Sequence, residues 1–201
     1  MKRTKLRENW LRIVVHVGAL LPLGVLLFDM LVGNLGPEPI REAILRTGKT
    51  ALVLLVLTLA CTPLNTLFSF KQALKLRRTL GLYAFGYAMI HFLIFTGVDY
   101  AFDWGLLKVE LLKRRYALVG LAAGTTMLPL ALTSFKYWQK RLGKNWKRLH
   151  RLIYLVGVLV AIHYIWLVKP GVIEPWYWAG GIALLLVLRL PIVRKLASRL
   201  R

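Results

Sequence analysis

Six long apolar runs, separated by short charged segments, constrain the fold of this 201-residue chain more than any other feature. A helix needs about 20 apolar residues to cross the hydrocarbon core of a bilayer, and each run reaches or nearly reaches that length. The sequence therefore predicts an all-α, polytopic membrane bundle that forms a single domain over residues 1–201. The predicted transmembrane helices cover residues 10–32, 50–70, 79–98, 116–135, 149–168 and 175–193.

The basic residues lie between the apolar runs and mainly on one side of the predicted topology. The chain carries 29 Lys+Arg against 8 Asp+Glu, a balance that in a soluble protein would indicate nucleic-acid binding. A hydrophobic content of 58% and a mean hydropathy of +0.59 argue against nucleic acid as a partner and for membrane lipid. With a cytoplasmic N-terminus, 21 of the basic residues lie on the cytoplasmic side and 8 on the other. This positive-inside distribution predicts that both termini are cytoplasmic.

Two histidines lie at broadly similar depth on the third and fifth predicted helices. His91 is about 18 Å from the cytoplasmic start of its helix, and His163 also lies in the outer half of the membrane. An imidazole in a bilayer needs a polar partner and tends to face the interior of the bundle. Two axial imidazoles saturate haem iron, so that a haem held in this way carries electrons rather than binding substrate. We therefore predict that haem is held between His91 and His163.

The other two histidines, His16 and His150, leave the number of haems open. His150 lies near the inner surface, about 20 Å before His163 along the same helix, which is a suitable separation for a second haem level. However, an ideal helix turns by roughly 220° between these two positions, so the helix would have to bend for both rings to share a face. His16 lies at a depth that suits a second haem opposite His150. The favoured alternative is that His16 is a structural or quinone-contacting histidine.

Other kinds of metal or transport chemistry find little support in the sequence. Cys61 is the only cysteine, so neither an intramolecular disulfide nor a cysteine metal cluster can form. A zinc site would need several neighbouring ligands, and the helices offer no pair at the spacing of one helical turn. No internal repeat is evident in the sequence, although transporters often contain one.

Several segments resemble a known family of membrane proteins. Residues 142–154 contain Trp146, Leu149, His150 and Tyr154, and resemble the W-x-x-L-H-x-x-x-Y region of the ferric-reductase-like transmembrane domain, whose superfamily includes NADPH oxidases. The chain as a whole resembles more closely MsrQ (formerly YedZ), the family of haem-binding membrane subunits of bacterial methionine sulfoxide reductase systems. The segments that carry this second resemblance are residues 16–22, 46–52, 62–64 and 77–82.

The MsrQ resemblance implies a haem b protein of the bacterial inner membrane that transfers electrons. Members take electrons from the quinone pool or from a cytosolic flavin reductase, and deliver them to the periplasmic molybdopterin enzyme MsrP, which repairs oxidised proteins by reducing methionine sulfoxide. The resemblance implies that His91, His150 and His163 are haem histidines. It also implies FMN as a cofactor, although no residue identifies a flavin site. Such a chain is an electron-transfer subunit of an oxidoreductase rather than its catalytic subunit.

Two departures from the wider superfamily narrow these expectations. Two-haem members carry a histidine pair on helix three, whereas this chain has Arg77 and Trp104 at the corresponding distances from His91. One haem between His91 and His163 is therefore favoured. The chain also lacks a G-x-G-x-x-G dinucleotide fingerprint, so the electron donor must be quinol or a separate reductase.

Several alternatives stay open at this point. Four arginines near the inner surface either pair with haem propionates or an FMN phosphate, or only set the topology: Arg77, Arg78, Arg148 and Arg151. The protein as a whole is alternatively a direct transmembrane ferric reductase acting on iron outside the cytoplasm. A third interpretation is a transporter or assembly factor whose histidines are structural.

Overall fold

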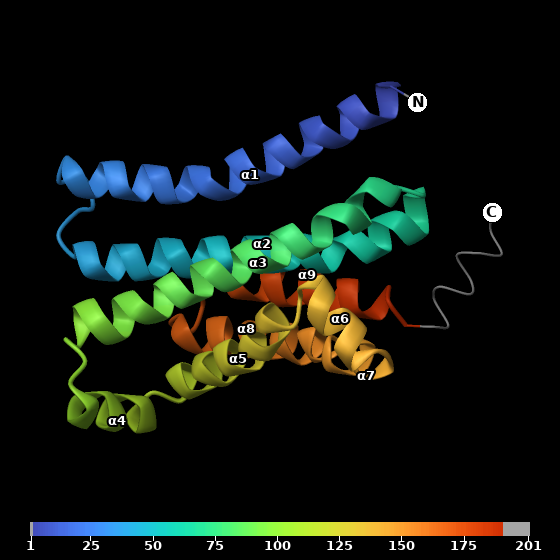
Figure 1. The fold of residues 1–201 in the computed structure, drawn as a ribbon. Coiled ribbons are helices and arrows are strands. Elements are labelled where there is room, and N and C mark those ends of the chain that lie inside the picture. Colours follow the sequence, from blue (N-terminus) through green and yellow to red (C-terminus); the bar gives the residue numbers. More distant parts are fainter. Residues whose placement is uncertain (1, 191–201) are drawn as a thin grey trace. The chain divides into compact units, whose positions relative to one another are not determined.

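The computed structural model describes the backbone of residues 2–190 and the side chains of residues 10–190 (Figure 1). Within this part of the chain every regular element is a helix, which confirms the predicted fold class. The elements form two compact units, Met1–Phe102 and Asp103–Arg201, and each unit is described by itself.

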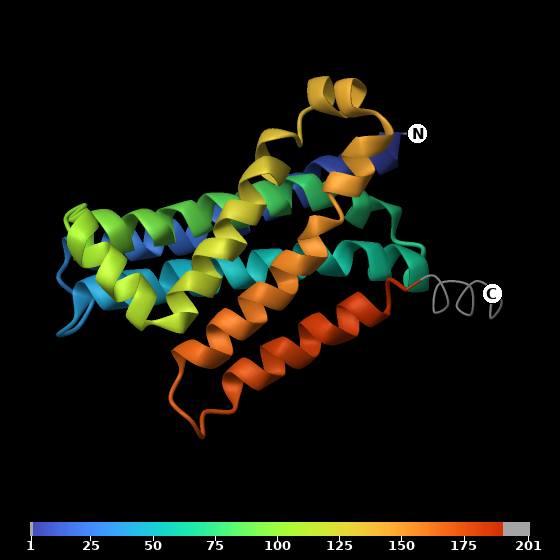
Figure 2. The ribbon, with the colours of Figure 1, turned by 90° about the horizontal axis from the view of Figure 1, so that it is seen from below.

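The first unit is built from three long helices that run alongside one another (Figures 1 and 2). They are α1 (Lys2–Leu31), α2 (Pro39–Phe68) and α3 (Lys71–Leu93), and α3 continues as a π-helical segment, η1 (Ile94–Asp99). The chain reverses between α2 and α3 at Ser69, which adopts a left-handed conformation with φ 53°. Leu59 of α2 and Ala84 of α3 are fully buried. A small residue such as Ala84 lets two helix backbones approach closely, as is common in membrane helix pairs.

A tyrosine of α3 is inserted into the hydrogen-bond ladder of α1. Pro22 lacks a backbone N–H and so interrupts the ladder of α1. Next to it, the hydroxyl of Tyr87 accepts a hydrogen bond from the backbone N–H of Leu23 (3.0 Å) and donates one to the carbonyl of Ala19 (2.6 Å). These two groups would bond each other in a regular helix. The inserted hydroxyl satisfies both, and it ties α1 to α3 at the irregular turn.

An ionic cluster joins the C-terminal end of α1 to the first half of α2. Arg46 donates hydrogen bonds to the carboxylates of Asp29 and Glu42, and Asn34 donates one to Asp29. These pairings offset the cost of placing charged groups beside apolar helices. They also explain why α2 begins at Pro39, well before the predicted start near residue 50, because its charged first turns are stabilised by partners that hydropathy does not register.

The second unit contains the helices α4 (Trp104–Lys113), α5 (Arg115–Leu132), α6 (Lys136–Leu142), α7 (Lys144–Leu149), α8 (Leu152–Leu167) and α9 (Glu174–Val187). Of these, α8 contacts both α5 and α9. Val156 of α8 is fully buried, and Ala123 of α5 and Ile182 of α9 are nearly so. Asp103 caps α4 by accepting hydrogen bonds from the backbone N–H groups of residues 105 and 106.

Three short helices of the second unit lie in or at the edge of the segments that connect the predicted transmembrane helices. These are α4, α6 and α7, and the last two are separated only by Gly143. Gly143 has φ 50° and ψ −118°, a conformation that is strained for residues with a Cβ. The glycine therefore divides one basic helical segment into two short helices, α6 and α7, and the chain changes direction between α5 and α8 (Figure 2).

Five of the described helical segments are long and apolar enough to cross a membrane. Most residues in these spans are not buried inside the protein, which suits contact with lipid. The described part of α9 is shorter, and residues 191–193 of the predicted sixth span lie outside the described residues. The count of six transmembrane helices and the cytoplasmic location of both termini therefore stay predictions. The five segments are Trp10–Leu31, Pro39–Phe68, Lys71–Asp99, Arg115–Leu132 and Lys144–Leu167.

Candidate functional site

His91 is half-buried near the end of α3 and is held by the backbone of α2. Its Nδ1 lies 2.9 Å from the carbonyl oxygen of Ile44. A carbonyl can only accept a hydrogen bond, so Nδ1 carries the proton and donates it. In a neutral imidazole this leaves Nε2 with its lone pair, which is the form of histidine that binds a metal.

His163 is held in the same way within the second unit. It is half-buried near the end of α8, and its Nδ1 donates a 2.7 Å hydrogen bond to the carbonyl oxygen of Tyr116 in the first turn of α5. Its ring also meets the ring of Tyr116 edge-on, with 6.0 Å between the centroids. The Nε2 of His163 therefore also carries a lone pair in the neutral ring.

The two histidines have the chemistry that axial ligation of haem iron requires. A hydrogen bond from the second ring nitrogen to a carbonyl fixes the tautomer, orients the ring and makes the ligating nitrogen more basic. The porphyrin supplies the remaining nitrogens, so the protein has to provide only axial ligands. Among the described residues, no group of three or more His, Cys, Asp or Glu side chains is placed to hold a bare metal ion.

His150 differs from these two histidines in its hydrogen-bond partner, because a threonine hydroxyl lies beside its Nε2. The hydroxyl of Thr133 lies 2.6 Å from the carbonyl of Pro129, to which it must donate its proton. It also lies 3.2 Å from Nε2 of His150, which therefore donates to the hydroxyl. Trp146 completes the cluster, because its indole stacks on the imidazole at 4.1 Å and donates to the carbonyl of Thr133 at 2.8 Å. The cluster fixes the bend between α5, α7 and α8.

His16 is exposed on α1 and has a different kind of partner. Its Nδ1 lies 2.8 Å from the hydroxyl of Tyr83 in α3, and the two rings meet edge-on. A hydroxyl both donates and accepts, so this contact does not fix the tautomer of His16. The contact ties α1 to α3, which supports the structural interpretation of His16.

The four arginines singled out from the sequence all have exposed side chains. Arg77 and Arg78 lie in the second turn of α3, and Arg77 donates a 3.4 Å hydrogen bond to the hydroxyl of Thr62. Arg148 lies in the last turn of α7, and Arg151 directly precedes α8. Their assignment to propionates or to a flavin phosphate stays a prediction.

Sequence reasoning missed the groups that hold His91 and His163. Both acceptors are backbone carbonyls, of Ile44 and Tyr116, and a carbonyl leaves no signature in the identity of its residue. Thr133 was missed as well. It is the fourth residue after Pro129, and its hydroxyl was the one available signal.

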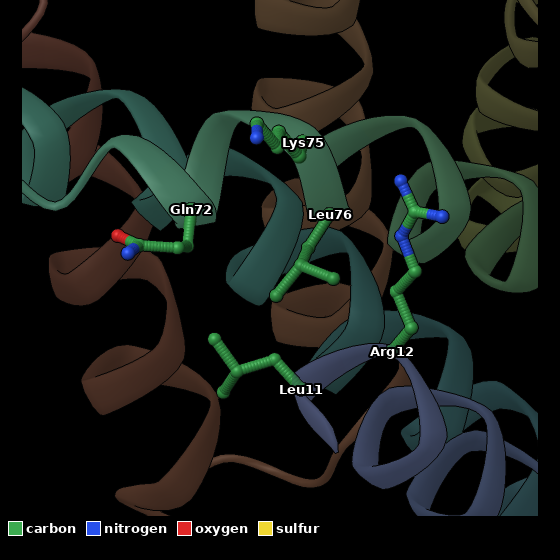
Figure 3. A pocket seen from close by; sticks show the side chains of 5 residues that line it. All are labelled: Leu11, Arg12, Gln72, Lys75 and Leu76. Atoms are coloured by element: carbon green, nitrogen blue, oxygen red, sulfur yellow. The ribbon is translucent and has the colours of Figure 1, made fainter. Parts of the chain in front are cut away.

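A small pocket lies in the first unit, and no histidine lines it. It is lined by residues near the N-terminal ends of α1 and α3, with two leucines beside two cations (Figure 3). The lining contains no histidine, cysteine or carboxylate, so it has no ligand for iron. The lining residues are Leu11, Arg12, Gln72, Lys75 and Leu76.

Comparison with known proteins defines the class of this chain. The sequence profile described as "Ferric reductase like transmembrane component" matches residues 47–161, which include His91 and His150 and end two residues before His163. Together with five candidate spans, this match makes the chain a multi-pass membrane protein of the ferric-reductase-like class.

Curated relatives narrow the class to one family. A protein of Xanthomonas axonopodis pv. citri is 42% identical over 192 residues, which cover 92% of this chain and 87% of the relative. A protein of Rhodospirillum rubrum is 41% identical over 194 residues, covering 96% and 93%. Both are named "Protein-methionine-sulfoxide reductase heme-binding subunit MsrQ". The chain belongs to the MsrQ family. No solved structure matches it.

Proposed function

We propose that this chain is the haem-binding membrane subunit of a methionine sulfoxide reductase system and passes electrons to a partner subunit. The observation that carries the proposal is that His91 and His163 each have the Nδ1 proton held by a backbone carbonyl within a candidate membrane span. The names of the relatives, which cover nearly the whole chain, supply the system in which such a subunit works.

In this proposal the Nε2 atoms of His91 and His163 would hold the iron of haem b. Bound haem takes up and releases single electrons, and its potential is set by the axial ligands and the groups around them. The carbonyls of Ile44 and Tyr116 accept the Nδ1 protons and so orient the two imidazoles, with Nε2 as the nitrogen that would bind iron. His150 is the third haem histidine of the proposal. It would ligate through Nδ1, or through Nε2 once its bond to Thr133 is broken.

The proposal assigns the donor and the acceptor to opposite sides of a bacterial inner membrane. Quinol or a cytosolic flavin reductase supplies electrons, and a periplasmic molybdopterin enzyme of the MsrP type accepts them and reduces methionine sulfoxide. The excess of basic residues in the predicted cytoplasmic segments supports docking of an acidic reductase on that side. FMN is a further proposed cofactor. The exposed side chains of Arg148 and Arg151 suit contact with an anionic group such as its phosphate.

The test is to follow reoxidation of the haem in the purified protein. The detergent-solubilised protein is reduced with dithionite, freed of excess reductant under anaerobic conditions, and mixed with a periplasmic molybdopterin methionine sulfoxide reductase. We expect the reduced haem bands to decay only when both this enzyme and methionine sulfoxide are present. Sulfoxide without the enzyme is the control and should leave the bands unchanged.

The match to a ferric-reductase-like profile favours one second candidate, direct reduction of ferric iron. The same reduced protein mixed with a ferric chelate tests it. Rapid reoxidation by the chelate, with no response to the molybdopterin enzyme and sulfoxide, would replace the proposed acceptor with iron. A folded protein that contains no haem would instead return the chain to the transporter or assembly-factor interpretation.

A further inference from the structure

The hydrogen bonds of His91 and His163 occupy equivalent positions in two antiparallel helix pairs. In α2–α3 the histidine follows its acceptor carbonyl, that of Ile44, by 47 residues. In α5–α8 the separation between Tyr116 and His163 is again 47 residues. Acceptor and histidine of the second pair therefore each lie 72 residues after their counterparts in the first.

A glycine occupies a third equivalent position in both pairs. Gly48 and Gly120 each lie four residues, or about one helical turn, after the acceptor carbonyl, and so face the same side of the helix. A Cβ on Gly48 would lie 3.0 Å from Nδ1 and 3.1 Å from Cε1 of His91. A Cβ on Gly120 would lie 2.6 Å and 2.7 Å from the same two atoms of His163. The same edge of each imidazole thus rests against a bare stretch of helix backbone.

We propose that α2–α3 and α5–α8 are two copies of one histidine-holding unit, in which Gly48 and Gly120 are positioning residues for the ligand histidines. The inference rests on the proposed function, because it takes both histidines to be haem ligands. Glycine brings the ring close enough to the helix for Nδ1 to reach the carbonyl one turn earlier. That hydrogen bond leaves Nε2 as the ligating atom.

Glycine normally destabilises the interior of a helix, so its presence at these two positions indicates a specific role. Glycine in a helix interior is less favourable than alanine, so replacing it normally stabilises a helix or leaves it unchanged. Gly124 shows the expected background, because a Cβ there would meet nothing within 4 Å. At Gly120 a Cβ would overlap the ring of His163 and push it from the carbonyl of Tyr116. At Gly48 the overlap is smaller, so the effect should be weaker.

The first test measures haem binding and redox potential in Gly120→Ala and Gly48→Ala. Loss of a group that orients a metal ligand typically weakens metal binding by about tenfold to a hundredfold. We expect losses of that order in haem affinity for Gly120→Ala and a smaller loss for Gly48→Ala. The haem that remains should have a raised midpoint potential, because an imidazole without its Nδ1 hydrogen bond is a poorer donor to ferric iron. Gly124→Ala and Gly86→Ala, which meet nothing within 4 Å, are the matched controls.

The second test is a double-mutant cycle on thermal unfolding of the haem-free protein, using Gly120→Ala and His163→Ala. If the glycine makes room for the ring, Gly120→Ala should lower the melting temperature when His163 is present and should not lower it in the His163→Ala background. An equal drop in both backgrounds would mean that Gly120 serves helix packing alone, and would overturn the proposal.

The two tests separate failure of this inference from failure of the proposed function. Wild-type haem affinity and potential in Gly120→Ala, together with loss of haem in His163→Ala, would overturn the positioning role and leave the ligand assignment standing. Full haem content in His163→Ala would instead remove the ligand assignment, and the positioning role with it. The ligand assignment is therefore tested by His163→Ala alone, independently of the glycine variants.

Discussion

The two helix pairs are alike at the ends that hold His91 and His163 and differ at the opposite ends. In the first pair α2 and α3 are joined by a two-residue turn at Ser69. In the second pair the connection between α5 and α8 contains two short helices and the cluster of His150, Trp146 and Thr133. Hydrogen-bond geometry is thus shared where a ligand histidine must be oriented, while the connections are free to differ.

In each unit a further helix packs against the pair: α1 in the first unit and α9 in the second. α1 is joined to α3 by the inserted hydroxyl of Tyr87 and by the contact between His16 and Tyr83. In the second unit α9 packs on α8, and the guanidinium of Arg189, just after α9, lies 5.3 Å from the ring centroid of Tyr154 in α8. The comparison therefore separates a common histidine-holding part from additions that stabilise each unit in its own way.

The largest effect is expected from removing either histidine. His91→Ala and His163→Ala should each abolish most haem binding, because each removes an axial ligand that the proposed copies contribute equally. Haem per chain, measured after purification from the membrane fraction, checks the prediction and also confirms insertion. The comparison would break if one variant lost its haem while the other kept it in full.

Removing the hydroxyl of Tyr87 tests the addition specific to the first unit. Tyr87→Phe should lower the free energy of unfolding by about 1–2 kcal/mol, because the N–H of Leu23 and the carbonyl of Ala19 lose their partner beside Pro22. Denaturant unfolding in detergent measures the loss. The haem spectrum should be unchanged, and a shifted spectrum would show that α1 contributes to the haem site.

Thr133→Val sharpens the difference between His150 and the other two histidines. The substitution keeps the shape of the side chain and removes the acceptor of the Nε2 proton, so we expect a loss of about 1 kcal/mol in stability with haem content unchanged. Unfolding and haem quantification on the same preparation report both quantities. More haem per chain than in the wild type would show that His150 ligates through Nε2 once Thr133 no longer engages that atom.

The smallest effect is expected at His16, which is exposed and whose ring contacts that of Tyr83 through a hydrogen bond and an edge-on packing. His16→Ala should retain the wild-type haem content, because neither ring nitrogen is set up as a ligand by a carbonyl acceptor. Quantifying haem alongside a Tyr83→Phe variant separates loss of the ring from loss of its partner. Loss of one of two haems in His16→Ala alone would assign it to a second haem.

The sequence predicted the helical class because bilayer thickness requires apolar runs that are directly visible. The predicted start of α2 was too late, because an apolar run is taken to end at charged residues even when these are paired. Arg46, for example, is paired with Asp29 and Glu42. The sequence contained no sign of α6 and α7, because a basic segment carries no membrane signal. Their break depends on the conformation of Gly143, which the surrounding charges do not reveal.

The sequence predicted the histidine side chains of the candidate site but not the backbone groups that hold them. His91 and His163 stand out because imidazoles are rare within apolar runs and need partners there. The equivalence of their surroundings was not evident, since the two helix pairs share the glycine and the histidine but few other residues at the 72-residue offset. The repeat becomes visible only in which carbonyl each ring reaches and in the space beside each glycine.

The most direct test of the central claim is a dithionite-reduced minus oxidised visible spectrum of the purified wild-type protein, with haem quantified per chain. The account predicts sharp b-type bands with at least one haem per chain, from two neutral imidazoles whose Nδ1 protons are held by carbonyls. A well-folded protein that is colourless, although purified from cells able to supply haem, would contradict it.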